Sequence, residues 1–212
     1  MGKRPRPNPR VVELPFVINN IKPGTILNIG GSGGEWKWDL AKKHKMTIVD
    51  TAPLHGEMKH PVTYVLKDIR RFDNGERYDN IILMSTIEHI SLPWFYKDKK
   101  PTWKISPWDE QLKTWHHCMS LLKPDGHMLF TVPCGIPSKT PHTKLHYDEK
   151  MLNEIKSGYK VLQEKYYIRP EGTDWLVAPH LPDDLFSHKE EMRMQGGWLI
   201  TRALALMVIT HT

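Results

Sequence analysis

The chain has 212 residues, 39% of them hydrophobic, which is enough to bury one full core and gives no indication of a second domain. Its formal charge of +6 does not imply a strongly basic binding face, because four positive charges lie in the first ten residues and the remainder balances 26 basic against 24 acidic residues. Two cysteines without CxxC spacing argue against a disulfide framework or a zinc site, and no apolar run approaches the ~20 residues that span a bilayer or forms the core of a signal peptide. These features predict a cytoplasmic protein without membrane contact.

The chain begins with a basic, Pro-rich leader, residues 1–12, that contains no acidic residue. Its positive charges are Lys3, Arg4, Arg6 and Arg10. Because chain ends are usually poorly ordered, we interpret the leader as a solvated tail, with an arm for nucleic acid or an anionic surface as the less favoured alternative. Residues 13–212 are expected to form a single domain.

Short apolar runs alternate with helix-compatible segments along the rest of the chain, and this alternation is typical of a parallel α/β sheet. Strands are expected at Thr25–Ile29, Met46–Val49, Val62–Leu66, Tyr78–Met84, His127–Val132, Lys160–Ile168 and Leu199–Ile209. Helices are expected at Gly34–Lys45, Trp108–Leu122 and Asp148–Ser157.

The helix Trp108–Leu122 has the clearest boundaries. Ser106 is a candidate N-cap, and Pro107 follows at the first helical position. Lys123–Gly126 reads Lys-Pro-Asp-Gly, which predicts a helix stop and a tight turn before the next strand.

Three long connections, near 91–107, 134–147 and 170–197, contain Pro, His, Gly and Trp residues. Structureless loops of such length in a compact domain are usually functional or disordered, and the aromatic content favours lids over a site. Aromatic side chains in Leu92–Tyr96 and at Trp175 offer flat surfaces that suit sugars, nucleotides or aryl groups, with ordinary core packing as the alternative.

The most informative segment is Thr25–Trp36, an apolar run that leads into four glycines among the five residues Gly30–Gly34. Glycines at the carboxyl end of a buried strand let the backbone turn sharply and approach a ligand without an intervening Cβ. A dinucleotide-binding turn requires G-x-G-x-x-G, and Trp36 stands where its third glycine belongs. The segment therefore predicts a cofactor-binding turn of another kind.

This turn, the acidic ends of the next two expected strands and the sequence Leu122–Gly126 together resemble the class I S-adenosylmethionine-dependent methyltransferases. The resemblance covers about Gly24 to Val132. It implies a Rossmann-like α/β fold with a seven-stranded, mostly parallel sheet, helices on both faces and an antiparallel last strand. It also implies S-adenosylmethionine as cofactor. Asn28 replaces the family's usual acid, and Ser32 replaces its middle glycine.

Within the turn, the resemblance assigns cofactor binding to the residues that match the family's pattern. They are Asn28, Gly30, Gly31, Ser32 and Gly34. Gly30 and Gly34 correspond to flexible backbone beside the methionine moiety. Asn28 is able to accept a hydrogen bond from the ligand's ammonium group but offers it no full charge.

The ends of the next two expected strands match the family's other cofactor contacts. Asp50 corresponds to an acid that accepts hydrogen bonds from both ribose hydroxyls, with Thr51 beside it; an exposed turn aspartate is the alternative. Asp68 corresponds to the acid at the adenine end, and Ile69 to the apolar residue that packs on the ring. For Asp68, a helix cap is the alternative.

The exit of the fourth expected strand resembles that of small-molecule members of the family with a Glu-His pair. The resemblance places Ser85 and Thr86 next to the sulfonium and the acceptor. Glu88 and His89 are candidates for positioning the acceptor or removing its proton, unless the pair simply begins a helix. His146 is a third candidate, because its segment is expected near the open end of the sheet.

Two further patterns limit the chemistry. The exit lacks the Asp/Asn-Pro-Pro-aromatic loop of amino-DNA methyltransferases, which argues against base methylation. His142 and His146 have the i, i+4 spacing of a metal site, but Pro141 and the lack of a third ligand argue against one, and no metal is expected.

The sequence thus predicts a methyltransferase that acts on a small polar metabolite of sugar, nucleotide or aryl type, at oxygen or nitrogen, by in-line transfer. Two alternatives stay open. One is a methyltransferase whose leader docks RNA or protein, and the other is a noncatalytic module that binds S-adenosylmethionine. The sequence leaves the oligomeric state undetermined.

Overall fold

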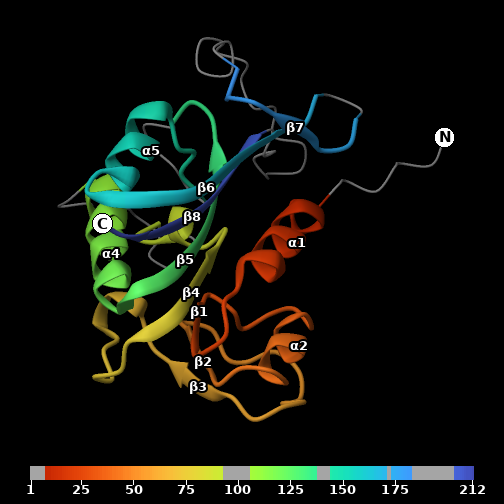
Figure 1. The fold of residues 1–212 in the computed structure, drawn as a ribbon, viewed down its shortest axis with the longest axis vertical. Coiled ribbons are helices and arrows are strands. Elements are labelled where there is room, and N and C mark those ends of the chain that lie inside the picture. The colour runs from red at the N-terminus through yellow and green to blue at the C-terminus, as the bar shows by residue number, and fades with distance from the viewer. Residues whose placement is uncertain (1–7, 93–105, 138–143, 171–172, 183–202) are drawn as a thin grey trace.

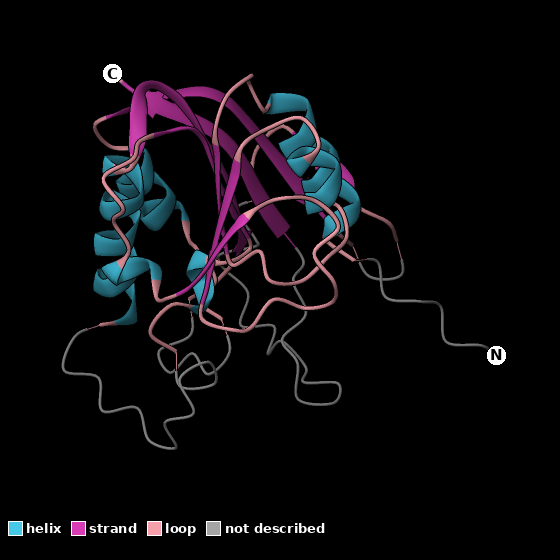
Figure 2. Cartoon of the chain, turned by 90° about the horizontal axis from the view of Figure 1, so that it is seen from below, coloured by secondary structure: helices cyan, strands magenta, loops and turns pink. Residues whose placement is uncertain are grey.

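The computed structural model describes residues 8–92, 106–137, 144–170, 173–182 and 203–212. In this part of the chain the strands form one sheet of eight, in the order β3-β2-β1-β4-β5-β8-β6-β7, with helices on both faces (Figures 1 and 2). The predicted α/β class is therefore confirmed.

Five strands form the parallel half of the sheet. They are β1 (Ile26–Ile29), β2 (Met46–Asp50), β3 (Thr63–Leu66), β4 (Tyr78–Met84) and β5 (Leu122–Cys134). All four residues of β1 are buried, because side chains from both layers of helices cover a central strand of a parallel sheet. The strand order reverses between β1 and β4, and ligands of open α/β sheets bind at the carboxyl ends of strands at such a point.

The other half of the sheet is antiparallel. β8 (Ala203–His211) lies between β5 and β6 (Tyr159–Ile168) and runs opposite to both. The predicted antiparallel last strand is confirmed. β7 (Leu176–Ala178) pairs with the end of β6 and makes the sheet one strand larger than expected. Three residues are too few to show a strand pattern, and this strand lies in a connection that we interpreted as a lid.

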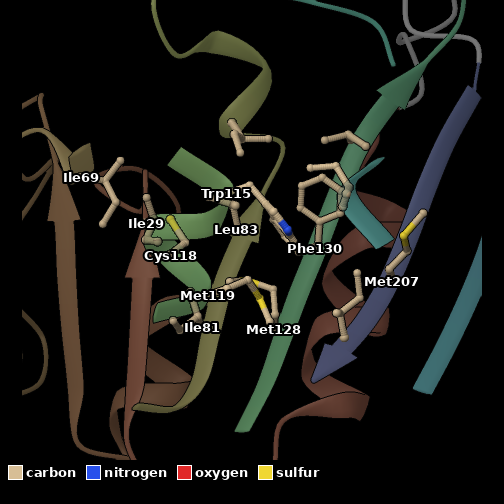
Figure 3. Packing of buried hydrophobic residues seen from close by; sticks show 14 of the residues in the cluster. Ile29, Ile69, Ile81, Leu83, Trp115, Cys118, Met119, Met128, Phe130 and Met207 are labelled. Atoms are coloured by element: carbon tan, nitrogen blue, oxygen red, sulfur yellow. The ribbon is translucent and has the colours of Figure 1, made fainter. Parts of the chain in front are cut away.

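The helices are α1 (Arg10–Asn20), α2 (Lys37–Ala41), α4 (Pro107–Ser120) and α5 (Glu149–Lys156), with short 3-10 turns η1 (Ile69–Arg71) and η2 (Ile87–His89). Helices α4 and α5 pack on one face over a cluster in which the rings of Trp115 and Phe130 lie 5.0 Å apart (Figure 3). Helix α1 packs on the other face through Phe16 and Val17. The described helices include none that is long and apolar enough to cross a membrane.

Helix α1 was not expected, and the predicted leader boundary after residue 12 falls inside it. Pro9 stands at the N-cap and Pro15 lies within the helix, so the segment carries the residue that most often marks helix ends. Burial of its apolar side compensates, since tertiary packing supplies most helical stability in proteins. Residues 1–7 lie outside the described part.

Three local expectations need correction. The helix expected at Gly34–Lys45 is only the short α2. Ser106 occupies the N-cap of α4 but makes no side-chain capping bond. Lys123–Gly126 is not a free turn, because it bulges within β5: Leu122 is opposite Tyr78, and His127 is already opposite Asn80. Most of the expected lids lie outside the described residues.

Candidate active site

A pocket of about 290 Å³ lies at the carboxyl ends of β1, β2, β3 and β4, beside the reversal of strand order. Its lining residues are Ile29, Gly30, Ser32, Val49, Asp50, Thr51, Ala52, Lys67, Asp68, Ile69, Ser85, Thr86, His89 and Ile90. Four segments distant in sequence thus meet at one edge of the sheet.

The glycine turn after β1 forms one wall, and its backbone needs glycine at Gly30. The φ of Gly30 is +73°, and a Cβ built there would lie 2.6 Å from side-chain atoms of Thr86. At Gly31, a Cβ would lie 2.2 Å from Asn28 Nδ2. Asn28 is buried, and its Nδ2 has no hydrogen-bond partner, so its amide packs against the turn and does not line the pocket.

Asp50, the last residue of β2, holds the turn in place. Its Oδ2 accepts a hydrogen bond of 2.8 Å from the Ser32 N–H, and its Oδ1 accepts one of 3.0 Å from the Ala52 N–H. Each carboxylate oxygen is able to accept two hydrogen bonds, so the group retains acceptor capacity toward the pocket. Asp50 is partly buried and lines the pocket, which disagrees with the alternative of an exposed turn aspartate.

Lys37 supports the turn from its buried side. Its Nζ donates to the carbonyl oxygens of Ser32 at 3.1 Å and Gly34 at 2.7 Å, although the residue is only 1% exposed. Burial lowers the pKa of Lys37, while the charges of Glu35 and Asp50 oppose that shift. A lysine at the start of an expected surface helix gives no sequence signal for such a role.

Asp68 lies at the other end of the pocket and caps η1. Its carboxylate accepts from the Arg70 N–H at 2.9 Å and forms an ion pair of 2.6 Å with the Arg70 guanidinium. Burial raises the pKa of Asp68, but hydrogen bonds and charge from Arg70 outweigh it and leave the pKa below its usual value. Asp68 therefore caps a helical turn, as the alternative predicted, and it also lines the pocket.

A buried carboxylate on α1 reaches the pocket wall after β4. Glu13 is fully buried and accepts hydrogen bonds from the hydroxyls of Ser85 and Thr131, the latter at 2.6 Å. Arg10 completes the group with an ion pair of 2.9 Å to Glu13. Ser85 has a φ of +44°, a conformation that is uncommon for a residue with a side chain. These bonds connect α1 directly to the site.

Glu88 and His89 are the last two residues of the 3-10 turn η2 and do not begin a longer helix. His89 lines the pocket, and its Nε2 lies 3.8 Å from Glu88 Oε1. Glu88 is buried outside the lining, and its Oε2 has no hydrogen-bond partner. Burial raises the pKa of Glu88 to about 8; the charge of Glu13 acts in the same direction, and that of Lys144 opposes it.

His146 is also buried, and neither ring nitrogen has a hydrogen-bond partner. It does not line the pocket, and burial together with the charge of Lys144 lowers its pKa to about 3. So weakly basic an imidazole is a poor proton acceptor near neutral pH, which does not favour His146 as the base; its catalytic role stays a prediction. His142, which has the i, i+4 spacing to His146 that we considered and argued against as a metal site, lies outside the described residues.

Comparisons with known proteins identify the fold. No protein-family model matches the chain, and no curated protein matches it significantly in sequence. Among solved structures, the N-methyltransferase NodS from Bradyrhizobium japonicum WM9, in complex with S-adenosyl-L-homocysteine, has a TM-score of 0.59 at 12% identity, over 95% of this chain and 85% of that one. The 1,6-didemethyltoxoflavin-N1-methyltransferase from Burkholderia thailandensis has a TM-score of 0.58 at 16% identity, over 96% and 77%. An S-adenosylmethionine-dependent methyltransferase from Clostridium acetobutylicum has a TM-score of 0.58 at 12% identity, over 94% and 91%. The chain has the class I methyltransferase fold.

Within this methyltransferase fold, the structure gathers most of the predicted cofactor residues in one pocket. Those that line it are Gly30, Ser32, Asp50, Thr51, Asp68, Ile69, Ser85 and Thr86. Asn28, Gly31 and Gly34 belong to the turn or its support but not to the lining. Of the three catalytic candidates, His89 alone lines the pocket.

Two residues that organise this site, Lys37 and Glu13, were not predicted from the sequence. Each is charged and buried, whereas charged residues in amphipathic segments are ordinarily read as solvent-exposed. One signal was present for Glu13, because it lies among the apolar residues of Arg10–Asn20. That signal is usable only once the segment is recognised as a helix.

Substitution of Gly30 by Ala should destabilise the fold. The left-handed backbone costs a residue with a Cβ roughly 1–2 kcal/mol, and Thr86 must also move, so we expect the free energy of unfolding to fall by about 1–3 kcal/mol. Gly33→Ala is the matched control in the same turn, because a Cβ there meets no atom within 4 Å. Urea unfolding of both variants measures the difference, and equal effects would contradict this account of the turn.

Stability should also depend on pH through Glu88. Its pKa in the folded chain, about 8, lies above the ordinary value of 4.5, so the unfolded chain releases this proton first as the pH rises. The contribution is complete below about pH 4.5 and is lost progressively as the pH rises to 8. Relative to Glu88→Gln, the wild-type chain should therefore lose more than about 1.4 kcal/mol between pH 5 and pH 8, the equivalent of one pKa unit.

Urea unfolding of the two proteins across that range tests the prediction. Parallel stability profiles would show that Glu88 titrates in the folded chain as it does in the unfolded one.

Proposed function

We propose that this protein is a cytoplasmic S-adenosylmethionine-dependent methyltransferase that acts at oxygen or nitrogen of a small polar metabolite of sugar, nucleotide or aryl type. The observation that carries the proposal is the pocket at the reversal of strand order, in a sheet with the class I methyltransferase fold. Two of the similar structures are described as N-methyltransferases, which supports a small-molecule acceptor.

The residues at the pocket fit the cofactor. A Cβ at Gly30 would clash with Thr86, so the lack of a side chain keeps the wall open to close backbone approach. We assign the methionine end of the ligand to Gly30 and Ser32. The remaining acceptor capacity of Asp50 suits two ribose hydroxyls, and Asp68 with Ile69 suits an adenine amine and ring.

When bound, S-adenosylmethionine supplies an electrophilic methyl group on a sulfonium centre. The protein's own contribution is to align the acceptor with that centre and, where needed, to hold the acceptor's proton. We assign the removal of the acceptor's proton to His89, which lines the pocket. The Oε1 atom of Glu88 lies 3.8 Å from the Nε2 atom of His89. Ser85 and Thr86 would face the acceptor from the wall after β4.

Two alternative functions each have an observation in their favour. The basic leader favours an RNA- or protein-directed methyltransferase, although Arg10 is engaged with Glu13 in α1. Binding that falls steeply with salt and is abolished by removal of residues 1–7 would favour this alternative. Asn28 and Ser32, at positions where the family usually carries an acid and a glycine, favour a noncatalytic binding module.

Calorimetric titration of the full chain with S-adenosylmethionine tests the proposal. We expect saturable binding, and we expect Asp50→Ala to weaken it at least tenfold, because the substitution removes both the ribose contact and the tie to the Ser32 N–H. Asp39→Ala is the matched control, an exposed aspartate on α2.

The lack of any binding at millimolar ligand would overturn the enzyme proposal. Binding that Asp50→Ala leaves unchanged would overturn the placement of the ribose alone. Mass spectrometry of a copurified ligand, followed by methyl-transfer assays on that compound, separates the enzyme from the noncatalytic module.

A further inference from the structure

We infer that Lys37 is a positioning residue for the cofactor, an internal cation that fixes the glycine turn and biases the pocket against a sulfonium relative to a neutral thioether. The inference rests on the proposed function, and it concerns a residue that does not line the pocket.

The Lys37 side chain is buried, and its ammonium group bonds to the protein. It is 1% exposed, and its Nζ donates to the carbonyl oxygens of Ser32 and Gly34 at 3.1 and 2.7 Å. A buried ammonium group is strongly unfavourable unless it is hydrogen-bonded, so these contacts keep the side chain in place. The same contacts restrict the turn, because both carbonyls must point toward Nζ.

The hydrogen bond from Lys37 is one of three that hold the backbone of Ser32. The Ser32 N–H donates to Asp50 at 2.8 Å, and the Ser32 carbonyl accepts from the His55 N–H at 3.1 Å as well as from Lys37. Both backbone polar groups of Ser32 are therefore bound. The backbone of this residue, which lines the proposed methionine end of the pocket, is therefore held from behind.

Lys37 also changes the charge near the glycine turn. At the position where the family usually carries an acid, this chain has the neutral Asn28, which is buried against Gly31. Lys37 thus places a positive charge behind the turn, with Glu35 and Asp50 as the two acids that act on it. A cation there repels a sulfonium and has no such effect on a neutral thioether.

The amino acid part of the ligand is the same in S-adenosylmethionine and S-adenosylhomocysteine. Loss of the turn's support should therefore weaken binding of both compounds. Loss of the charge should at the same time relieve a repulsion that only S-adenosylmethionine experiences. A purely structural lysine would instead weaken both equally, so the ratio of the two affinities isolates the electrostatic part.

The experiment is calorimetric titration of the full chain with each compound, using Lys37→Met, which keeps the side chain's length but removes its charge and donors. We expect binding of S-adenosylhomocysteine to weaken at least tenfold, and the loss for S-adenosylmethionine to be at least threefold smaller. Lys42→Met is the matched control, because Lys42 is exposed at the end of the same helix and pairs only with Asp39 among the ion pairs of the described residues. It should change neither affinity by more than twofold.

Lys37→Gln provides a second variant in case the Met variant does not fold, as judged by circular dichroism. It is neutral but retains an N–H donor, so it should show the same shift in the affinity ratio with a smaller overall loss. Unchanged affinities would overturn the inference, and so would equal losses for the two compounds. Failure of the wild-type chain to bind either compound would overturn the proposed function instead.

Discussion

The hydrogen bond between the Ser32 N–H and the Asp50 carboxylate is the interaction on which the site depends. It joins the turn after β1 to the end of β2, and so converts two neighbouring strand ends into one wall of a pocket. Parallel pairing makes this possible, because it brings the carboxyl ends of both strands to the same edge of the sheet. Thr86 then limits the turn from the side of β4 and makes glycine necessary at Gly30. The remaining contacts of the site adjust the shape of this wall and the charge near it.

Two buried charges act on the pocket from outside its lining. Lys37 lies behind the glycine turn, and Glu13 lies behind the wall after β4, where it accepts from Ser85 and Thr131. Both are hydrogen-bonded to groups that the pocket needs in one conformation. A buried charge with satisfied partners is costly to disturb, since the loss of one partner leaves the other unpaired in a poorly solvated place. Electrostatic interactions therefore restrain the site at the glycine turn and at the wall after β4, while apolar packing supports the strands.

Much of this arrangement was predictable from sequence because it follows from repeating patterns. The central strands, α4 and α5 have long or regular apolar signals, and the glycine turn reflects a backbone requirement that few other residues meet. The prediction was wrong where local signals conflict with tertiary packing. Pro9 and Pro15 concealed α1, and three residues were too few to reveal β7. Lys37 and Glu13 were missed because sequence patterns alone do not show that a charged side chain will be buried.

The contact between Glu13 and Ser85 has a thermodynamic consequence for the whole domain. Since Ser85 belongs to the pocket wall and Glu13 to α1, docking of this helix and occupation of the pocket act on the same hydroxyl group. Linkage requires that such an influence be reciprocal: if the docked helix favours the ligand-competent wall, then a ligand must stabilise the docked helix by the same free energy. Helix α1, whose first residues were expected to belong to a solvated tail, is then a thermodynamic partner of the site.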